Sequence, residues 1–281
     1  MRKWPRRLSV VGATLAGTVL SLSLVLWILV RSTPQWYRPA SMSPQQCDAA
    51  AQRATNKLVT VQNEAASVRA AEQAARIRPG STLATQPASI TISFTDDELN
   101  ALVATWSVQP DFRAIYDRFM SDPYIVLNDG RMILAGRLKE LNSLASLHFE
   151  PKMDGQGRLN LALVKTLAGN LPLPTALAAQ YEQKATNRIA QQLAVWRRQA
   201  SIDPSGIAND SAISATLGKL LMDVLQGQSA DPILFLPLVD HGSIPVRVSG
   251  MSIQDHTLTL IVQPMGPDER GELVRRIREG K

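Results

Sequence analysis

Three successive carboxylates, Asp96, Asp97 and Glu98, are the densest cluster of chemically active side chains in this sequence. Neighbouring carboxylates can share a proton in acid–base catalysis or bind a metal ion. Here they follow Thr95 directly, and Thr-x-x-Glu is the capping box that begins many helices. Carboxylates in the first turn are also favoured by the helix dipole. We therefore interpret the cluster as the start of a helix, not as a catalytic or metal site.

Two Asp-His dipeptides, at residues 240–241 and 255–256, are the other candidates for metal ligands, because aspartate and histidine together can bind zinc. Both lie in turn-like sequence, and nothing in the chain order brings them together. The third histidine, His148, falls on the polar face of a predicted strand. We predict that these side chains lie in solvated positions and that the protein holds no metal and no other cofactor.

Sequence motifs for other chemistries are absent. The chain has no Gly-x-Ser-x-Gly, no His-Glu-x-x-His and no phosphate-binding loop, and Cys47 is its only cysteine. Gly155 and Gly157 lie between two predicted strands and precede no helix, so they indicate a hairpin turn instead of a nucleotide site. We predict a protein without enzymatic activity.

The elements that position these residues follow from the period of the apolar side chains. Residues 48–78 show a narrow helical stripe, Leu58, Val61, Ala65 and Val68, that suits packing on the protein's own domain better than a long coiled coil. Strands are predicted around Asn128-Asp129-Gly130, a typical hairpin turn, and where Leu159, Leu161 and Leu163 alternate. Further helices are predicted at residues 175–199, 207–225 and from 267, and further strands at residues 90–94, 145–149, 246–248, 251–253 and 258–262.

The amino-terminal segment, residues 8–30, contains no charged side chain. At about 1.5 Å per residue, a helix of this length crosses a hydrocarbon core of about 30 Å. Arg2, Lys3, Arg6 and Arg7 precede it, which places the amino terminus in the cytoplasm. A signal peptide is the alternative, but its apolar region would be shorter and would end in a small-residue cleavage site. We predict a transmembrane helix.

This topology divides the chain into four parts. Residues 1–7 are cytoplasmic, residues 8–30 cross the inner membrane once, residues 31–46 form a Pro-rich linker and residues 47–281 form an extracytoplasmic domain. Five of the six net positive charges lie in residues 1–31, so the folded part lacks the basic surface that a nucleic-acid partner would need. The predicted partners are the membrane, through residues 8–30, and a lipid or an envelope protein.

Three short motifs occur in this order of elements: Trp36-Tyr37-x-Pro39, residues 94–102 and Gly169-Asn170-Leu171-Pro172-Leu173-Pro174 ahead of a long helix. In these features, over residues 88–182 and 244–262, the chain resembles the uncharacterised bacterial YpmS-like membrane proteins. It is more distantly similar to tubular lipid-binding (TULIP-like) domains. Residues 207–236 have no place in that pattern.

The resemblance implies an α+β fold in which a curved antiparallel sheet packs on long amphipathic helices and leaves an apolar channel for acyl chains. Such a channel needs apolar side chains that the helix does not fully cover. The candidate lipid-binding residues are Leu147, Phe149, Leu161, Leu177, Tyr181, Ile189, Trp196 and Leu260. Each of them also suits an ordinary core. Two functions therefore follow: a non-enzymatic carrier or sensor of a lipid or another apolar envelope molecule, or an anchored scaffold that holds no ligand.

Overall fold

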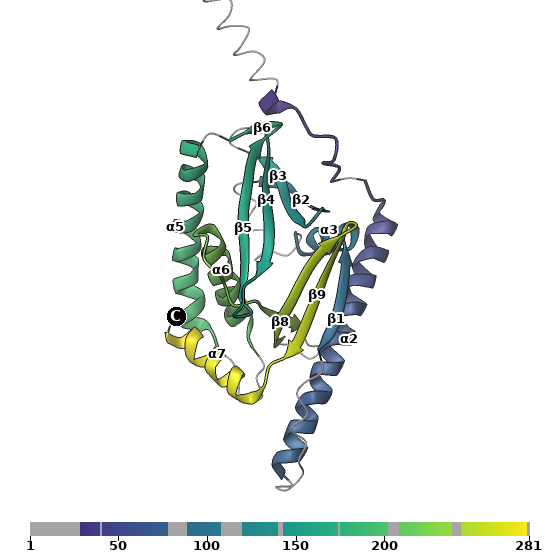
Figure 1. The fold of residues 1–281 in the computed structure, drawn as a ribbon, viewed down its shortest axis with the longest axis vertical. Coiled ribbons are helices and arrows are strands. Elements are labelled where there is room, and N and C mark those ends of the chain that lie inside the picture. The colour runs from purple at the N-terminus through teal and green to yellow at the C-terminus, as the bar shows by residue number, and fades with distance from the viewer. Residues whose placement is uncertain are drawn as a thin grey trace, which may run out of the picture.

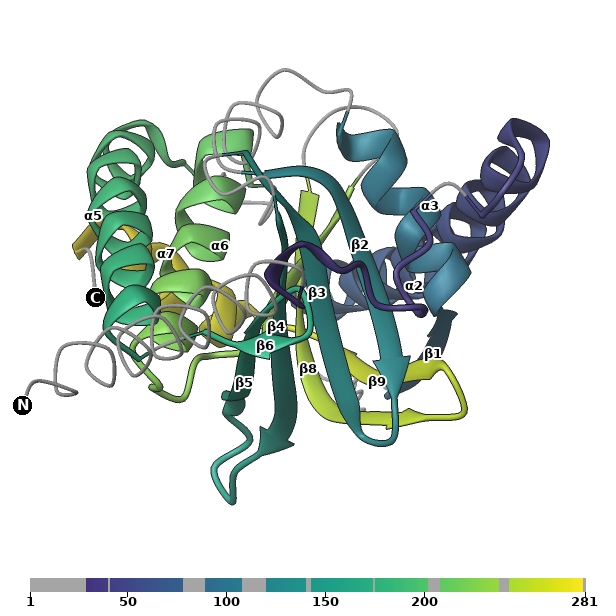
Figure 2. The ribbon, with the colours of Figure 1, turned by 90° about the horizontal axis from the view of Figure 1, so that it is seen from above.

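The computed structural model describes residues 29–39, 41–77, 89–107, 120–139, 143–173, 175–201, 208–237 and 243–279. Over these residues the fold is α+β with two antiparallel sheets. Figures 1 and 2 show the sheets between two groups of helices, with α2 and α3 on one side and α5, α6 and α7 on the other.

The first sheet joins strands from the two ends of the domain. Its order is β1 (Ile90–Thr95), β9 (Thr257–Pro264), β8 (Ser243–Gln254) and β7 (Ile233–Pro237). Ile92 pairs with Leu260 and Phe94 with Leu258, and all four side chains are buried in the largest hydrophobic core. β8 and β9 form a hairpin whose turn, Asp255-His256, has positive φ at both residues, as a type I′ turn requires.

The second sheet is an antiparallel meander whose five strands follow one another in chain order. It contains β2 (Met120–Asn128), β3 (Arg131–Leu138), β4 (Ser143–Met153), β5 (Leu159–Ala168) and β6 (Leu171–Pro172). The predicted hairpin turn is confirmed, because Asp129 and Gly130 join β2 to β3 with φ of 46° and 76°. The sequential antiparallel strands are confirmed as well.

The expected fold, one curved sheet behind a transmembrane helix, is wrong and needs two corrections. β1 pairs with β9 and not with the meander, so there are two sheets. This pairing joins residues far apart in the chain, so the local sequence pattern does not predict it. In the part of the chain that the structure describes, no helix is long and apolar enough to cross a membrane. Most of the segment 8–30 lies outside the described residues.

Helix α2 (Pro44–Ile77) packs on its own domain, as predicted, through buried Ala54, Val61 and Ala65. It begins four residues earlier than the expected 48. Ser43 and Gln46 cap it reciprocally: Ser43 N donates to Gln46 Oε1 (2.9 Å) and Gln46 N donates to Ser43 Oγ (3.3 Å). Pro44 is therefore the first helical residue, a position that tolerates proline, and does not belong to an extended linker.

On the other side, α5 (Thr175–Gln199), α6 (Asp210–Leu225) and α7 (Pro267–Glu279) pack together. The bounds of α5 match the prediction. Gly218 of α6 lies directly under the ring of Trp196 from α5, since a Cβ at Gly218 would approach that ring to 3.0 Å. Strand β7 was not predicted.

The segment around Tyr37 lies on one face of the second sheet, which we call the outer face. Tyr37 is buried against Ala135 and Leu144, and its hydroxyl donates to the carbonyl of Asp122 (2.7 Å). Its ring meets that of Tyr124 edge-on at 5.7 Å between centroids. Burial, together with the carboxylate of Asp122, raises the pKa of Tyr37 to about 12. This part of the predicted linker is therefore packed on the domain.

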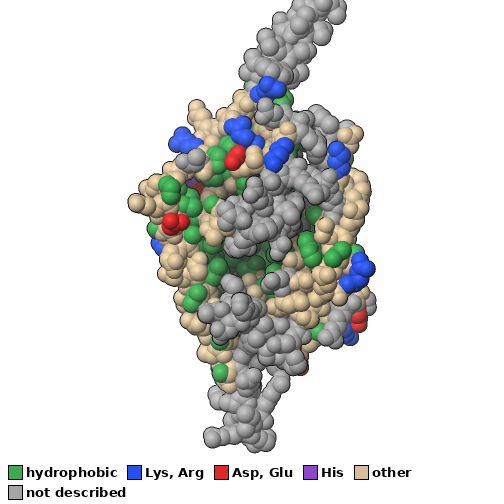
Figure 3. Space-filling view, turned by 180° about the vertical axis from the view of Figure 1, so that it is seen from behind, with side chains coloured by type: hydrophobic (Ala, Val, Ile, Leu, Met, Phe, Trp, Pro, Cys, Tyr) green, Lys and Arg blue, Asp and Glu red, His purple; other side chains and the backbone are tan. Residues whose placement is uncertain are grey.

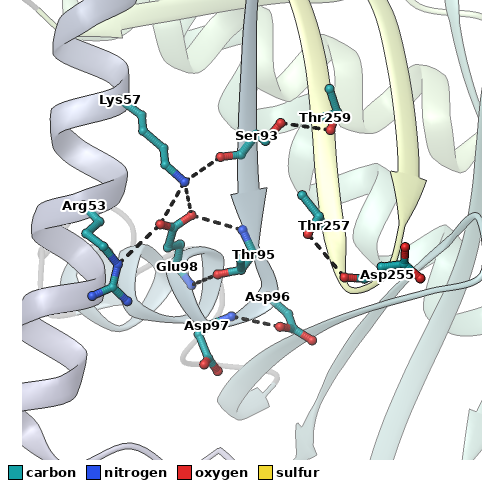
Figure 4. Close-up of polar contacts among 10 residues, drawn as sticks. All are labelled: Arg53, Lys57, Ser93, Thr95, Asp96, Asp97, Glu98, Asp255, Thr257 and Thr259. Atoms are coloured by element: carbon teal, nitrogen blue, oxygen red, sulfur yellow. Dashed lines mark hydrogen bonds and ion pairs between the residues drawn. The ribbon is translucent and has the colours of Figure 1, made fainter.

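The junction between β1 and α3 (Asp96–Ser107) is the predicted capping box (Figure 4). Thr95 N donates to Glu98 Oε2 (3.1 Å), and Glu98 N donates to Thr95 Oγ1 (3.3 Å). The carboxylate of Glu98 is also held from α2: Lys57 Nζ lies 2.9 and 2.7 Å from its two oxygens, and Arg53 Nε lies 3.6 Å away. Glu98 is 3% exposed, so its charge is buried and compensated.

These contacts set the protonation of Glu98. Burial alone would raise the pKa of its carboxyl, but the hydrogen bonds from Lys57 and from Thr95 N, with the positive charges of Lys57 and Arg53, outweigh burial and lower the pKa below its usual range.

A second buried polar side chain, Asn100, connects α3 to the second sheet. Its Nδ2 donates to the carbonyl of Ile125 (2.7 Å), and its Oδ1 accepts from Ile125 N (2.7 Å). Asn100 thus satisfies the backbone of β2, an edge strand, as a neighbouring strand would.

We predict that Thr95→Ala lowers the free energy of unfolding by about 0.5 to 2 kcal/mol without changing the fold, because it removes the N-cap of α3. Urea unfolding measures the loss. Thr105→Ala is the matched control, since the Thr105 hydroxyl lies on the same helix and donates to Ala101 O within that helix. Equal stability of the two variants would show that the cap does not hold α3.

We also predict that Glu98→Gln lowers the free energy of unfolding at pH 7. The variant should also lose less stability than the parent protein when the pH is lowered. A carboxylate with a lowered pKa in the folded state stabilises above the unfolded pKa, about 4.3 for glutamate, and loses this effect as the pH falls through the folded value. Urea unfolding at pH 7 and at several values below 5 tests this. If both proteins lose the same stability on acidification, the role assigned to Glu98 is wrong.

Candidate functional site

The inner face of the second sheet, opposite to the face that Tyr37 covers, carries a continuous set of large apolar side chains. The register aligns Ile125, Leu134 and Leu147 across β2, β3 and β4. In the next row Phe149 lies opposite Met132 on one side and Leu163 on the other. Leu161 extends this face along β5, opposite Pro151. Strand alternation thus gathers aliphatic groups from four strands on one surface.

Burial along the inner face is uneven. Leu127 is fully buried where β2 meets the first sheet, and Phe149 is 5% exposed. Leu134, Leu147 and Leu161 are only partly buried, and Leu163 is 45% exposed. The face is therefore filled at the end next to the first sheet and open toward β5. A ligand or partner that covers this half-exposed aliphatic surface would bury it from water, and this burial would favour binding.

The space-filling view shows the molecule from the side opposite to that of Figure 1. Hydrophobic side chains gather in a hollow in the middle of this side of the molecule (Figure 3). Figure 2 shows that the sheets lie between α3 on one side and α6 on the other.

The candidate lipid-binding residues fall into separate places. Leu147, Phe149 and Leu161 share the inner face. Leu260 belongs to the core of the first sheet, where it is 6% exposed and packs with Ile92 and neighbours.

The remaining four candidates lie on α5. Trp196 packs against α6, and Ile189 is partly buried. The structure does not describe the side chains of Leu177 and Tyr181. The structure therefore brings together only the three candidates on β4 and β5.

The position of α5 explains this separation. The helix packs chiefly on α6 and α7, and its buried Leu193 and its Trp196 pack around Gly218. A glycine in the middle of an apolar helix is a signal for such close approach. Leu134 was not predicted as a site residue. Leu163 was predicted to lie on the same inward strand face as Leu161, but it was not among the candidate lipid-binding residues. The signal for Leu134 was its period of two with Met132 in the predicted hairpin, and that for Leu163 was its alternation with Leu161.

The polar side chains that first suggested chemistry have structural partners. His148 Nε2 lies 3.2 Å from Ser146 Oγ on the outer face, and burial, with the charges of Lys165 and Arg131, lowers the pKa of His148. His256 Nδ1 lies 3.2 Å from Asp96 Oδ2. Asp240 and His241 lie outside the described residues. In the described part of the chain, no group of three or more His, Cys, Asp or Glu side chains is placed to hold a metal ion.

No family model, no curated protein and no solved structure matches the chain. The resemblance to YpmS-like and tubular lipid-binding proteins therefore stays a prediction from the sequence.

Proposed function

We propose that this protein is a non-enzymatic binding protein that holds an acyl chain or another apolar molecule on the inner face of the second sheet. The observation that carries the proposal is the incomplete burial of Leu134, Leu147, Leu161 and Leu163 on one surface. These side chains have no polar group, so the ligand must be recognised by its apolar area.

On such a surface, the affinity for a ligand depends more on the length of its apolar chain than on its head group. Burial of each methylene contributes roughly 0.8 kcal/mol. A chain of about ten methylenes thus gains about 8 kcal/mol, from which the cost of association is subtracted. A lipid or a similar long apolar molecule can bind on this basis alone, whereas a small polar metabolite cannot.

We further propose that the domain works on the outer side of the cytoplasmic membrane. This rests on the sequence of the amino-terminal segment: residues 8–30 carry no charge, four basic residues precede them, and only Arg31 and Arg38 come closely after them. That asymmetry keeps residues 1–7 in the cytoplasm and exports residues 31–281.

The second candidate function is a scaffold in an envelope assembly, in which a partner protein covers the inner face. The filled core around Leu260 favours it, because that core, which also contains buried Ile92 and Phe94, leaves the first sheet without space for a ligand. Both functions use the same exposed aliphatic side chains of the second sheet.

We predict that the full chain, extracted gently from its native membrane, carries a bound apolar molecule that native mass spectrometry detects. Leu163→Gln should strongly reduce this occupancy with little loss of stability, because Leu163 is already 45% exposed. Ile261→Gln is the matched control: Ile261 is 39% exposed on β9, next in sequence to the core residues Leu260 and Val262 but not part of that core.

Three outcomes separate the candidates. Occupancy lost in the Leu163 variant and kept in the Ile261 variant supports the carrier. Equal loss in both contradicts the assignment to the inner face. If the parent protein shows only its own mass, without a ligand, and another protein is cross-linked at position 163, the scaffold function is supported and the carrier function is contradicted.

For location, we predict that an alkaline phosphatase fused after Lys281 is active and that a cytoplasmic fluorescent reporter fused there is not. The reverse pattern would exclude an extracytoplasmic domain. Replacing Arg2, Lys3, Arg6 and Arg7 by glutamine should weaken this orientation, because these side chains carry the charge asymmetry.

A further inference from the structure

A second concave site lies away from the inner face of the second sheet. It is a cavity of about 250 Å³ among α5, α6, α7 and the start of β7. Arg158, in the turn between β4 and β5, also borders it. At roughly 30 Å³ per water-sized group, the cavity holds about eight such groups, which suits a small molecule and not a whole phospholipid.

One side of the cavity is aliphatic. Leu220 of α6, Ile233 of β7 and Leu273 and Ile277 of α7 line it. Leu273 and Ile233 are buried in the core that joins these helices, so this wall is rigidly supported.

The other side is cationic. Arg158, Arg197, Lys219 and Arg276 line the cavity, against only two carboxylates, Asp223 and Asp231. Both carboxylates are already paired: Lys219 Nζ lies 3.0 Å from each oxygen of Asp223, and Arg276 forms an ion pair with Asp231. The lining therefore carries an excess of two positive charges.

Two of the guanidinium groups, those of Arg197 and Arg276, have N–H donors without a hydrogen-bond partner among the described residues. Arg197 makes no hydrogen bond or ion pair with the residues that the structure describes, although it is partly buried. The Nε of Arg276 is buried and has no hydrogen-bond partner there, and Oε1 of Glu272 lies 3.7 Å from it, beyond hydrogen-bond distance. A buried donor without a partner is costly, so such a group marks a place where an acceptor is expected.

We propose that this cavity binds a small amphipathic carboxylate. Its carboxylate accepts hydrogen bonds from Arg197 and Arg276, and its short apolar chain lies against Leu220, Leu273 and Ile277. Guanidinium groups suit this role because their donors match the two oxygens of a carboxylate. The proposal is independent of the apolar ligand on the inner face, because none of the inner-face residues lines the cavity.

The test is a calorimetric titration of the full chain with three probes: hexanoate, hexan-1-ol and inorganic phosphate. Hexanoate presents both the charge and the apolar chain, and each of the other two presents one of them. We expect hexanoate to bind at least about tenfold more tightly than either, since one charge-assisted hydrogen bond corresponds to about that factor.

The variants are Arg197→Gln and, as the matched control, Arg198→Gln. Arg198 is its exposed neighbour on α5, does not line the cavity, and its Nε donates to Ala194 O of its own helix. We expect hexanoate binding to fall about tenfold in the first variant and to persist in the second. A third variant, Ala215→Leu, fills the cavity from α6 and should abolish binding; the urea midpoint of each variant verifies that it is folded.

The proposal is overturned if hexanoate does not bind the parent chain, or if both arginine variants bind it equally. Hexan-1-ol binding as tightly as hexanoate would remove the cationic role. Phosphate binding as tightly as hexanoate would reduce the cavity to a plain anion site.

Discussion

A single buried carboxylate, that of Glu98, connects the parts of this domain that the chain order keeps apart. A charge at 3% exposure costs several kcal/mol unless it is paired and hydrogen-bonded. Here Lys57 of α2 and the backbone of Thr95 in β1 satisfy it, and Lys57 also donates to Ser93 O of β1 (2.7 Å). The charge is therefore stable only when α2, β1 and α3 meet in one geometry.

The constraint extends from this junction to the second sheet. Asn100, on the helix that Thr95 and Glu98 cap, forms hydrogen bonds with both backbone groups of Ile125 in β2. Ile125 stands in the same row as Leu134 and Leu147, so the inner face is positioned by α3, the helix whose first turn contains the buried carboxylate. Next to this contact Leu127 and Met132 pack into the common core, and farther along, toward β5, the aliphatic side chains remain partly exposed.

The two concave sites of the domain differ in kind because different elements build them. The inner face is made by strand alternation, and its named side chains are apolar. The cavity among α5, α6 and α7 combines an aliphatic wall with arginines from separate parts of the chain, Arg158, Arg197 and Arg276. One surface selects apolar length, whereas the other selects a charged end group. Gly218 permits the close packing of α5 on α6 that brings Arg197 to the cavity.

The sequence by itself determined the local features of this protein. The capping box at Thr95 and Glu98, the turn at Asp129-Gly130 and the bounds of α5 follow from interactions between residues close in the chain, and all are confirmed. Alternation also placed Leu147, Phe149 and Leu161 on one surface.

Only the tertiary structure decided which surfaces meet. The pairing of β1 with β9, the packing of α5 on α6 and not on a sheet, and the buried position of Leu260 depend on contacts between distant segments. A period of two or of 3.6 shows that a face is apolar, but it does not specify what covers that face. The resemblance to tubular lipid-binding domains implied a single curved sheet, whereas long-range pairing produced two.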